Sequence, residues 1–460
     1  MLRRYSSHGT VGEGLPSLAG RLEDPPDCAR TLFETTQLLL SMEASNMNQS
    51  AQNQAANTPS VTSVPLLDLK RQHDPLQGQF AEALAKICQS GWFCLGPDVK
   101  QLEEGVAKYS RAKHAIACGS GSDALLLALM ALDLGPGDEV IVPSFTFFAT
   151  ASAAARLGAT PVFADIDPVS FNIDPSDVQR KITARTKAVI PVHLYGQCAE
   201  MDTLMQIAEA AGIAVIEDAA QAIGAEFDGR RAGSIGHMGC LSFYPTKNLG
   251  GAGDGGMVTS NDDALAKKVQ LLRVHGMEPR YYHGLLGVNS RMDSFQAAIL
   301  NVKLPHLDRW TRMRTENAHR YTDMFLEAGL DRALSLPRAL PHRRHVWNQY
   351  VVRVPDGRRD DLRAFLNEAK IGAEVYYPLG LHEQECFAYL GYGRGDLPET
   401  DRATEEVLAL PIFPELTAAE QAAVVTRVTQ FYDGPAKGHK LAGPNFLKRR
   451  DGVAKRDSQN

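Results

Sequence analysis

The sequence predicts an α/β fold with a mainly parallel central sheet. Short β-type runs alternate with helical runs between residues 114 and 272, and this alternation is typical of parallel sheets that helices cover on both faces. The composition agrees, because 44% hydrophobic and 22% charged residues are ordinary for a globular protein. A chain of 460 residues is long enough for about two to four domains.

The predicted strands are short apolar runs, and helical runs lie between them. The pattern is clearest at 201–211, where apolar side chains recur on one helical face. Gly212 follows at the position that often ends a helix in a left-handed conformation. We expect strands at 114–118, 139–142, 160–164, 188–192, 213–216 and 256–259, and helices at 123–132, 149–157, 201–211 and about 265–272.

A different pattern begins near Pro305 and predicts a second, smaller α+β domain. Pro305 interrupts a helical stretch, and a long amphipathic helix is expected after it at about 308–328. A β-type run at 346–354 and a helical run at 360–368 come next. We therefore divide the chain into a poorly ordered extension at 1–64, a large α/β domain at 65–308, a small α+β domain at 309–432 and a basic tail at 433–460.

The two ends of the chain differ in composition from the rest. Residues 45–64 carry no charge and are rich in Asn, Gln, Ser and Ala, so burial cannot offset the entropy of ordering them. We expect one short helix near 31–44, and Met47 is a candidate start of translation that the intact mass of the native protein would test. We expect the tail to be a solvated basic segment, and binding to phosphate or to a membrane is the alternative.

The composition also argues against several classes of function. A formal charge of −6 gives no electrostatic basis for binding nucleic acid. The longest apolar run, 124–132, is less than half the ~20 residues of a membrane-spanning helix, and no apolar stretch follows the basic start as in a secretory signal. The seven cysteines are scattered and none forms a CxxC pair, which favours reduced cytoplasmic thiols over disulfides or a zinc site.

Two segments place chemically useful groups at carboxyl ends of strands, where open parallel sheets bind ligands. The segment 118–123, CGSGSD, joins a strand to a helix. Its glycines and helix N-terminus suit a phosphate, although a plain capping turn has the same composition. Asp218 ends a buried-type strand and can hold a positively charged ring nitrogen. Its spacing from Gln221 also fits a helix capping box.

Two further segments surround a lysine and a run of aromatics. Lys247 precedes the glycine run 250–256. A lysine whose pKa is lowered by its surroundings can form a Schiff base, whereas a single lysine is more often a surface charge. The glycine run precedes a β-type stretch, so it is not a dinucleotide fingerprint. The aromatics 145–148 can stack on a flat ring or fill the core, and segments 280–283 and 284–293 can bind a ligand or form a loop and a helix cap.

The combination of these features is more specific than any one of them. A phosphate cradle, a stacking aromatic, a carboxylate at a strand end and a Schiff-base lysine, in this order, are what pyridoxal 5′-phosphate (PLP) needs. Its phosphate must be neutralised, its ring stacked and its pyridine nitrogen kept protonated. A lysine must hold its aldehyde and then move a proton.

With these residues in view, the chain resembles the DegT/DnrJ/EryC1/StrS family of sugar aminotransferases, which have the aspartate-aminotransferase (type I) PLP fold. The likeness covers about residues 64–436. It runs through motifs that include "GPGDEVIVPSFTFFAT", "VIEDAAQAIGA", "SFYPTKNLGGAGDGGMV", "LGVNSRMDSFQAAIL" and "VYYPLGLHEQ". The resemblance implies a PLP-dependent transaminase that uses L-glutamate as amino donor.

The resemblance assigns roles by matched position. Lys247 matches the lysine that forms the Schiff base with PLP, and Asp218 matches the partner of the pyridine nitrogen. Asn289 matches a phosphate contact that the neighbouring subunit supplies, which implies a homodimer with shared active sites. The remaining matches are Gln221 near the ring hydroxyl, Phe147 on the ring face, and Gly121, Ser122, Ser242 and the Asp123 amide at the phosphate.

The motifs around Lys247 are similar to the branch that acts on 3-keto nucleotide sugars, and amination at a 4-keto position is the alternative. This likeness gives Arg280, His283 and Tyr377 contacts with the sugar. Relatives that handle a uronic acid carry His where this chain has Tyr376, which points away from a carboxylated sugar. Two other interpretations remain. One is a regulatory member of the fold without catalysis. The other is a nucleotide-binding oxidoreductase, which is disfavoured because the loop is GSGSDA rather than GxGxxG.

Overall fold

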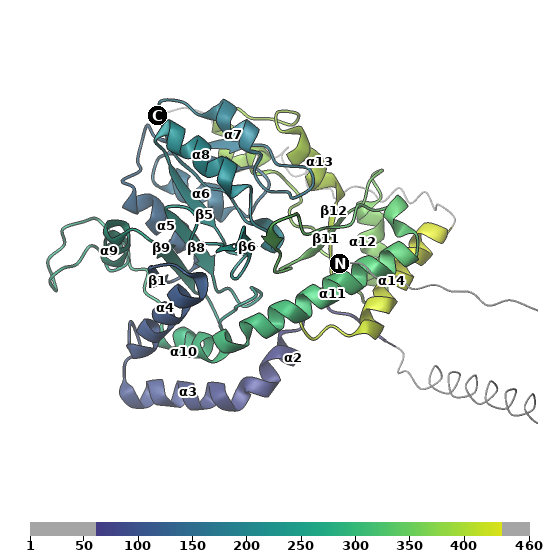
Figure 1. The fold of residues 1–460 in the computed structure, drawn as a ribbon, viewed down its shortest axis with the longest axis horizontal. Coiled ribbons are helices and arrows are strands. Elements are labelled where there is room, and N and C mark those ends of the chain that lie inside the picture. The colour runs from purple at the N-terminus through teal and green to yellow at the C-terminus, as the bar shows by residue number, and fades with distance from the viewer. Residues whose placement is uncertain (1–60, 435–460) are drawn as a thin grey trace, which may run out of the picture. The chain divides into compact units, whose positions relative to one another are not determined.

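A seven-stranded sheet forms the centre of the computed structural model, which describes residues 61–434 (Figure 1). The strand order is β1-β9-β8-β5-β4-β2-β3. Within this sheet only β9 runs antiparallel to its neighbours, which confirms the mainly parallel sheet expected from the sequence. The strands are β1 (His114–Cys118), β2 (Glu139–Pro143), β3 (Thr160–Ala164), β4 (Thr186–Val189), β5 (Ala214–Asp218), β8 (Met238–Ser242) and β9 (Gly256–Ser260).

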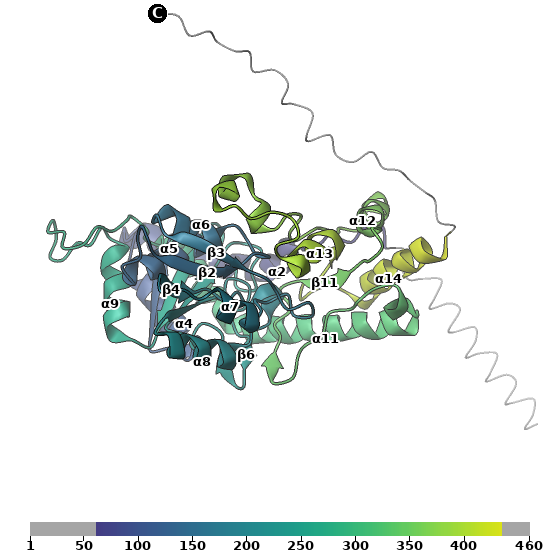
Figure 2. The ribbon, with the colours of Figure 1, turned by 90° about the horizontal axis from the view of Figure 1, so that it is seen from above.

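Helices cover both faces of this sheet because side chains alternate along its strands. In β1, Ala115 and Ala117 face the core that α4, α7 and α8 cover, whereas Ile116 and Cys118 face the core of α5, α6 and α9. Figure 2 shows the strands between these two layers. The helices are α2 (Leu69–His73), α3 (Gln77–Ser90), α4 (Pro97–Ser110), α5 (Gly121–Ala131), α6 (Ala149–Arg156), α7 (Pro175–Lys181), α8 (Met201–Ala211), α9 (Asp263–Leu272) and α10 (Ser294–Lys303).

Most boundaries predicted from the sequence agree with these elements. Gly212 has the expected left-handed conformation, with φ of 66°, after α8. The helix expected at 123–132 begins two residues earlier, because Ser120 is its N-cap and accepts a hydrogen bond from the Asp123 amide. The strand expected at 188–192 ends at Val189. Helices α2, α3 and α4 were not predicted from the sequence.

The C-terminal part packs around the long helix α11 (Leu307–Glu327), in a core that also includes Phe145 and Tyr195 from the N-terminal part. Pro305 lies in a 3-10 turn between α10 and α11, as the sequence predicts. Figure 1 shows α11 running toward α12 and α14. A predicted division of the chain near residue 308 stays a prediction. The other elements are α12 (Arg359–Glu368), α13 (Pro398–Glu406), α14 (Ala418–Asp433), the pair β11 (Tyr350–Arg353) and β12 (Val407–Leu410), and the short β6 (Glu226–Phe227), β7 (Arg230–Arg231) and β10 (Arg343–Arg344).

The strand predicted at 346–354 is wrong over its first residues. The amides of Val346 and Asn348 donate to the carbonyls of Gly196 and Tyr195, both at 2.9 Å. These bonds hold the chain against residues 195–196 as a loop, so that β11 begins only at Tyr350. The loop matters for function because Asn348 and its neighbour Gln349 line the cavity described below.

The predicted N-terminal extension ends earlier than residue 64. Val64 is fully buried, and its amide and carbonyl bond to Lys370 and Gly372 at 2.9 and 2.8 Å. Residues 1–60 and 435–460 lie outside the described part, and with them the predicted helix at 31–44, Met47 and nearly all of the basic tail. Within residues 61–434, none of the helices combines the length and hydropathy that crossing a membrane requires.

Candidate active site

A cavity of about 760 Å³ lies at the carboxyl end of the central sheet. Its wall combines the ends of β5 and β8, the start of α5, the loops after β2 and β8, and residues of α11 and β12. This is the edge at which open parallel sheets bind ligands. The predicted site residues that line it are Gly121, Ser122, Phe147, Asp218, Gln221, Ser242, Lys247 and Tyr377.

The start of α5 presents backbone amides that suit an anion. The first N–H groups of a helix have no partner within the helix, and Gly121 and Ser122 bring theirs to the cavity wall. A Cβ on Gly121 would lie 2.7 Å from the Cβ of Ser242, so only glycine permits this approach of α5 to β8. The capping turn and the phosphate site, which were alternatives from the sequence, are thus compatible in one segment.

Asp123 has a different position from the one that the resemblance implies. Its amide donates to Ser120 Oγ at 3.1 Å and is therefore not available to a phosphate. Its carboxylate accepts from Ser290 Oγ at 2.8 Å, and Ser290 Oγ accepts from the Gly119 amide at 3.0 Å. Asp123 therefore fastens the cradle to the segment before α10, and it does not line the cavity.

Asp218 presents a buried carboxylate at the end of β5. It accepts from Thr150 Oγ1 at 2.8 Å and from the Ala220 amide at 3.2 Å. Burial raises its pKa, and the two hydrogen bonds, Lys247 and His193 oppose that rise. Residues 219–222 form a turn rather than a helix, which rules out the capping box that the spacing to Gln221 allowed. The carboxylate thus suits a cation brought by a ligand.

Among the described residues, Lys247 is the only lysine that lines the cavity. Removal from water lowers its pKa from 10.5 to about 8, against the opposing charge of Asp218. Within residues 61–434, no hydrogen bond or ion pair to its Nζ is found. A lysine in these surroundings reaches its neutral, nucleophilic form near neutral pH, which is what Schiff-base chemistry requires.

The lowered pKa predicts how Lys247 affects stability. Between pH 8 and 10.5 the unfolded chain binds more protons than the folded one, so the free energy of unfolding rises with pH across this interval. Lys247→Met is therefore expected to stabilise the cofactor-free protein at pH 7 by about 1–3 kcal/mol. The gain should vanish by about pH 10.5. Urea denaturation at several pH values measures it.

The matched control for this prediction is Lys187→Met. Lys187 is exposed on β4, and its replacement should leave the free energy of unfolding nearly unchanged at every pH. A gain for Lys247→Met that is constant from pH 7 to 10.5 would show that the substitution acts by packing alone.

Phe147, Gln221 and Tyr377 border the same space. Phe147 is 58% exposed, and its ring centroid lies 6.5 Å from that of Tyr377. Gln221 donates Nε2 to the Tyr377 hydroxyl at 3.2 Å, while its Oε1 accepts from the Tyr195 amide at 2.7 Å. One face of Phe147 is therefore free to stack on a planar ring beside a hydroxyl and an amide that are held in place.

Contacts from the C-terminal part hold the loop that carries Phe147. Ser144, at the start of this loop, accepts from the His382 amide at 3.1 Å, and its Oγ lies 2.7 Å from His382 Nδ1. The other ring nitrogen of His382 lies 3.2 Å from a carboxylate oxygen of Asp401. All three side chains are buried. The position of the aromatic thus depends on residues more than 200 positions away in the sequence.

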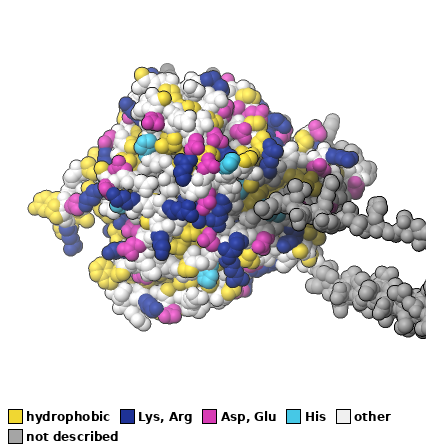
Figure 3. Space-filling view, viewed as in Figure 1, with side chains coloured by type: hydrophobic (Ala, Val, Ile, Leu, Met, Phe, Trp, Pro, Cys, Tyr) yellow, Lys and Arg dark blue, Asp and Glu magenta, His cyan; other side chains and the backbone are white. Residues whose placement is uncertain are grey.

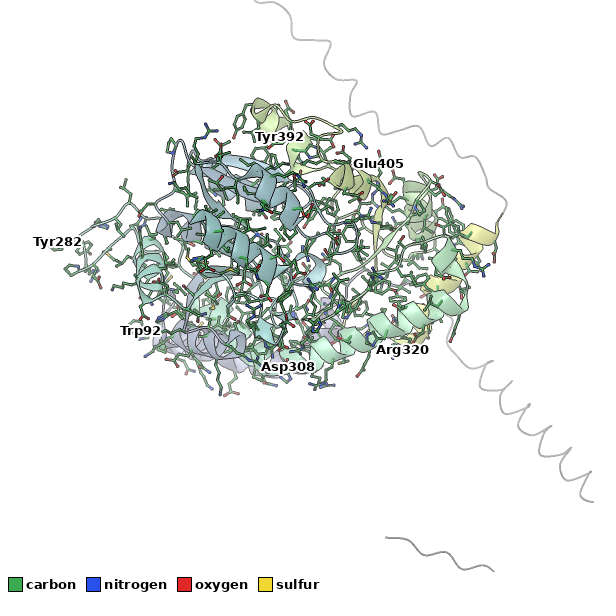
Figure 4. The ribbon with its side chains drawn as sticks, turned by 45° about the horizontal axis from the view of Figure 1, so that its top comes forward. Trp92, Tyr282, Asp308, Arg320, Tyr392 and Glu405 are labelled. Carbon is green, nitrogen blue, oxygen red and sulfur yellow. The ribbon has the colours of Figure 1, made fainter. Side chains whose placement is uncertain are left out.

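Arg280, His283 and Asn289 lie outside the cavity, on a projecting segment between α9 and α10. All three are exposed, and Arg280 stacks on Tyr281 at 4.9 Å. Figure 4 shows Tyr282 at the tip of the segment and Trp92 on the same side of the molecule. Figure 3 shows an apolar tip there, and Tyr281, Tyr282 and Leu286 are its exposed apolar residues. In one copy of the chain, these predicted site residues do not join the rest.

The sequence analysis missed several residues that line the cavity or support its wall. Thr150 bonds to Asp218 but gave no signal, because a threonine in a helix has no distinctive spacing. Arg314 and Gln349 come from the C-terminal part, and only the fold brings them to the sheet. Within the β-type run 346–354, the two consecutive polar residues at 348–349 were the one clue that its first part is not a strand.

Comparison with known proteins finds relatives that this chain matches over nearly their whole length. The sequence matches the DegT/DnrJ/EryC1/StrS aminotransferase family over residues 75–429. It is 53% identical over 369 residues to a pleiotropic regulatory protein of Geobacillus stearothermophilus, covering 80% of this chain and 98% of that protein. It is 43% identical over 373 residues to a UDP-N-acetyl-3-dehydro-alpha-D-glucosamine 3-aminotransferase of Acidithiobacillus ferrooxidans, covering 81% of this chain and 99% of that enzyme.

A solved structure supports the same relationship. The fold resembles that of DesV from S. venezuelae, crystallised in complex with a ketimine intermediate, with a TM-score of 0.78 and 40% identity. The alignment covers 82% of this chain and all of that one. The parallel sheet, the cavity at its carboxyl edge and the match over residues 75–429 lead to one conclusion. The chain belongs to the DegT/DnrJ/EryC1/StrS aminotransferase family.

Proposed function

We propose that the protein is a PLP-dependent aminotransferase that moves the amino group of L-glutamate to the C3 keto group of a nucleotide sugar. The observation that carries this proposal is the position of the Lys247 amine, with a pKa of about 8, in the same cavity as the buried carboxylate of Asp218. The relatives that act on 3-keto sugars support the choice of position. PLP, when bound, withdraws electrons from the carbon that bears the amino group.

The residues of the cavity fit this cofactor. The amides of Gly121 and Ser122 and the hydroxyl of Ser242 suit its phosphate, because the start of α5 attracts negative charge. Asp218 suits its protonated ring nitrogen, and that cation would compensate the cost of burying the carboxylate. Phe147 offers its exposed face to the ring, and Gln221 lies near the ring hydroxyl in this assignment.

Lys247 performs the proton transfers in both halves of the reaction. Its neutral Nζ would remove the proton from Cα of L-glutamate; the amino group is retained for the sugar, water supplies the keto oxygen, and 2-oxoglutarate leaves. In the second half the lysine returns a proton to C3 of the sugar, the carbon that receives the nitrogen. An amine with a pKa of about 8 can both take and give a proton near neutral pH, which is the condition for general acid–base catalysis in two directions.

The direct test is the complete reaction. The buffer contains a reducing agent, because the six cysteines of the described part are free thiols and a cytoplasmic location is expected. Purified protein is incubated with PLP, L-glutamate and UDP-N-acetyl-3-dehydro-glucosamine, and the products are identified by mass spectrometry. We expect the 3-amino sugar and an equal amount of 2-oxoglutarate. Amination of a 4-keto nucleotide sugar in its place would contradict the C3 assignment and leave the transaminase assignment intact.

We further propose that the protein acts as a homodimer in which each active site is completed by the partner's projecting segment. Three observations support this: Arg280, His283 and Asn289 do not line the cavity, the segment exposes Tyr281, Tyr282 and Leu286, and Phe147 and Tyr244 are exposed at the cavity itself. A second copy of the chain would cover these apolar groups. Asn289 would then reach the phosphate of the other subunit.

Complementation between two inactive variants tests the shared site. Lys247→Ala removes the amine of one site, and Asn289→Asp places a carboxylate beside the phosphate of the other. In a mixed dimer one site combines Lys247 with an intact Asn289, so mixing is expected to restore about a quarter of the native activity. No restoration, with mixed dimers confirmed by native mass spectrometry, would show that each subunit forms its own site.

A regulatory role is the second candidate, because the 53% identical relative is described as a pleiotropic regulatory protein. A binding protein derived from an enzyme has no need of a lysine with a lowered pKa and a buried acid in one cavity. One measurement separates the two functions. A purely regulatory protein would show no amino-transfer half-reaction with L-glutamate, whether or not it binds PLP.

A further inference from the structure

Arg314 is a second cation in the wall of the cavity, where it differs from its apolar neighbours. Arg314 is a residue of α11 and is only 3% exposed. Among the residues of the cavity wall, Arg314 and Lys247 are the cations, and Asp218 and Asp254 are the anions. Since Lys247 and Asp218 are assigned to the cofactor, the positive charge of Arg314 is left without a role in the proposed reaction.

The contacts of Arg314 hold its guanidinium in one orientation. Nη1 donates to the carbonyls of Ile412 at 3.0 Å, Trp347 at 3.1 Å and Asn348 at 3.5 Å. Within residues 61–434, no hydrogen bond to Nε or Nη2 and no ion pair is found for this side chain. Burial lowers its pKa to about 10, against the more distant charge of Glu415, so that it remains charged at neutral pH.

Two further contacts place Arg314 near the reacting centre. Asn348, whose carbonyl accepts from Arg314, donates its side-chain amide to Asn248 Oδ1 at 2.8 Å. Asn248 directly follows Lys247. The adjacent Gln349 also lines the cavity, and its buried Oε1 has no hydrogen-bond partner among the described residues. The Arg314 guanidinium and the free Oε1 of Gln349 thus lie in one wall of the cavity. Two hydrogen bonds, through Asn348, connect Arg314 to Asn248, the residue that follows Lys247.

We propose that Arg314 binds a carboxylate of the amino donor. An unpaired buried charge is costly unless a ligand completes it, and the planar guanidinium matches a carboxylate through two parallel hydrogen bonds. L-Glutamate brings such a group in every turnover, whereas a nucleotide sugar carries its charge on the diphosphate. The inference rests on the proposed transaminase function and adds a binding site for its first substrate.

The test compares donors that differ by one carboxylate. The rate of the donor half-reaction, kcat/KM, is measured from the loss of visible absorbance of the PLP-loaded protein. The donors are L-glutamate, its α-amide (isoglutamine) and its γ-amide (L-glutamine), and the variants are Arg314→Gln and Arg314→Lys. Arg312→Gln, which replaces an exposed arginine of the same helix outside this cavity, is the matched control.

We expect Arg314→Gln to lower kcat/KM for L-glutamate by about 10- to 100-fold. For the donor whose amide replaces the bound carboxylate, kcat/KM should fall little further in Arg314→Gln. The preference of the native protein for L-glutamate over that donor should therefore disappear. Arg314→Lys should be intermediate, KM for the keto sugar should be unchanged, and Arg312→Gln should behave as the native protein. If Arg314→Gln does not fold, the same comparison of donors in Arg314→Lys decides.

Two results would overturn the inference. An equal loss for all three donors would mean that Arg314 only shapes the wall through its carbonyl contacts. A change confined to KM for the keto sugar would assign the guanidinium to the sugar. Failure of the native, PLP-loaded protein to react with any donor would refute the proposed function itself, and the donor site with it.

Discussion

Replacing Lys247 with alanine is expected to lower turnover by about 10³-fold or more, because one side chain supplies both the nucleophilic amine and the proton transfers. The variant should keep its fold, since in the described structure the amine makes no hydrogen bond that holds the chain. It should also retain PLP, because the cradle at Gly121, Ser122 and Ser242 and the carboxylate of Asp218 are unchanged. Turnover and bound cofactor are measured on the same preparation.

Lys247→Arg is the control that separates charge from chemistry. Arginine keeps a positive charge near Asp218 but does not lose its proton in proteins, so this variant should be as inactive as Lys247→Ala. Turnover within a few-fold of the native rate in either variant would show that another group moves the proton, and the account would be wrong at its centre.

Asp218→Asn is expected to lower kcat by about 10²- to 10³-fold with a smaller effect on KM. Asparagine has nearly the same shape and its single oxygen can still accept from Thr150 Oγ1, so the substitution removes the charge and one of the two hydrogen bonds that the carboxylate accepts. Without the carboxylate, nothing in the described cavity wall stabilises a protonated ring nitrogen at this position, since Asp254 is the other acidic residue there. Steady-state kinetics with both substrates measures the loss.

Thr150→Val gives a graded comparison for Asp218. It removes the hydroxyl that donates to the carboxylate at 2.8 Å but keeps the charge, so its effect should lie between those of the native protein and Asp218→Asn. Native kcat in Asp218→Asn would mean that the carboxylate serves only the fold. Since Asp218 also bonds the Ala220 amide, thermal denaturation is recorded for each variant.

The parts of the site that the sequence predicted are those in which one short segment contains the whole signal. Asp218 ends a run of buried apolar residues, and Lys247 precedes a run of glycines, so each could be placed at the edge of the sheet without knowledge of distant residues. The mainly parallel sheet followed in the same way, from β-type and helical runs that alternate along the chain.

The parts that the sequence could not predict depend on contacts between distant segments. Arg314 lies on a helix whose pattern only indicates an amphipathic element, and three carbonyls from two other segments orient it. The loop at 346–349 was predicted as a strand because its composition is β-type, while backbone bonds to Tyr195 and Gly196 decide its path. Asp123 fits a phosphate contact by position, but its amide is used by the helix cap.

The absorbance spectrum of the purified protein, before and after addition of L-glutamate, tests the central claim most directly. The account predicts a visible band of lysine-bound PLP that is lost as L-glutamate is added and 2-oxoglutarate forms, with Lys247→Ala lacking this response. A protein that shows no visible band even after PLP is supplied would contradict the assignments of the cradle, Asp218 and Lys247 together, and the regulatory reading would replace the proposed one.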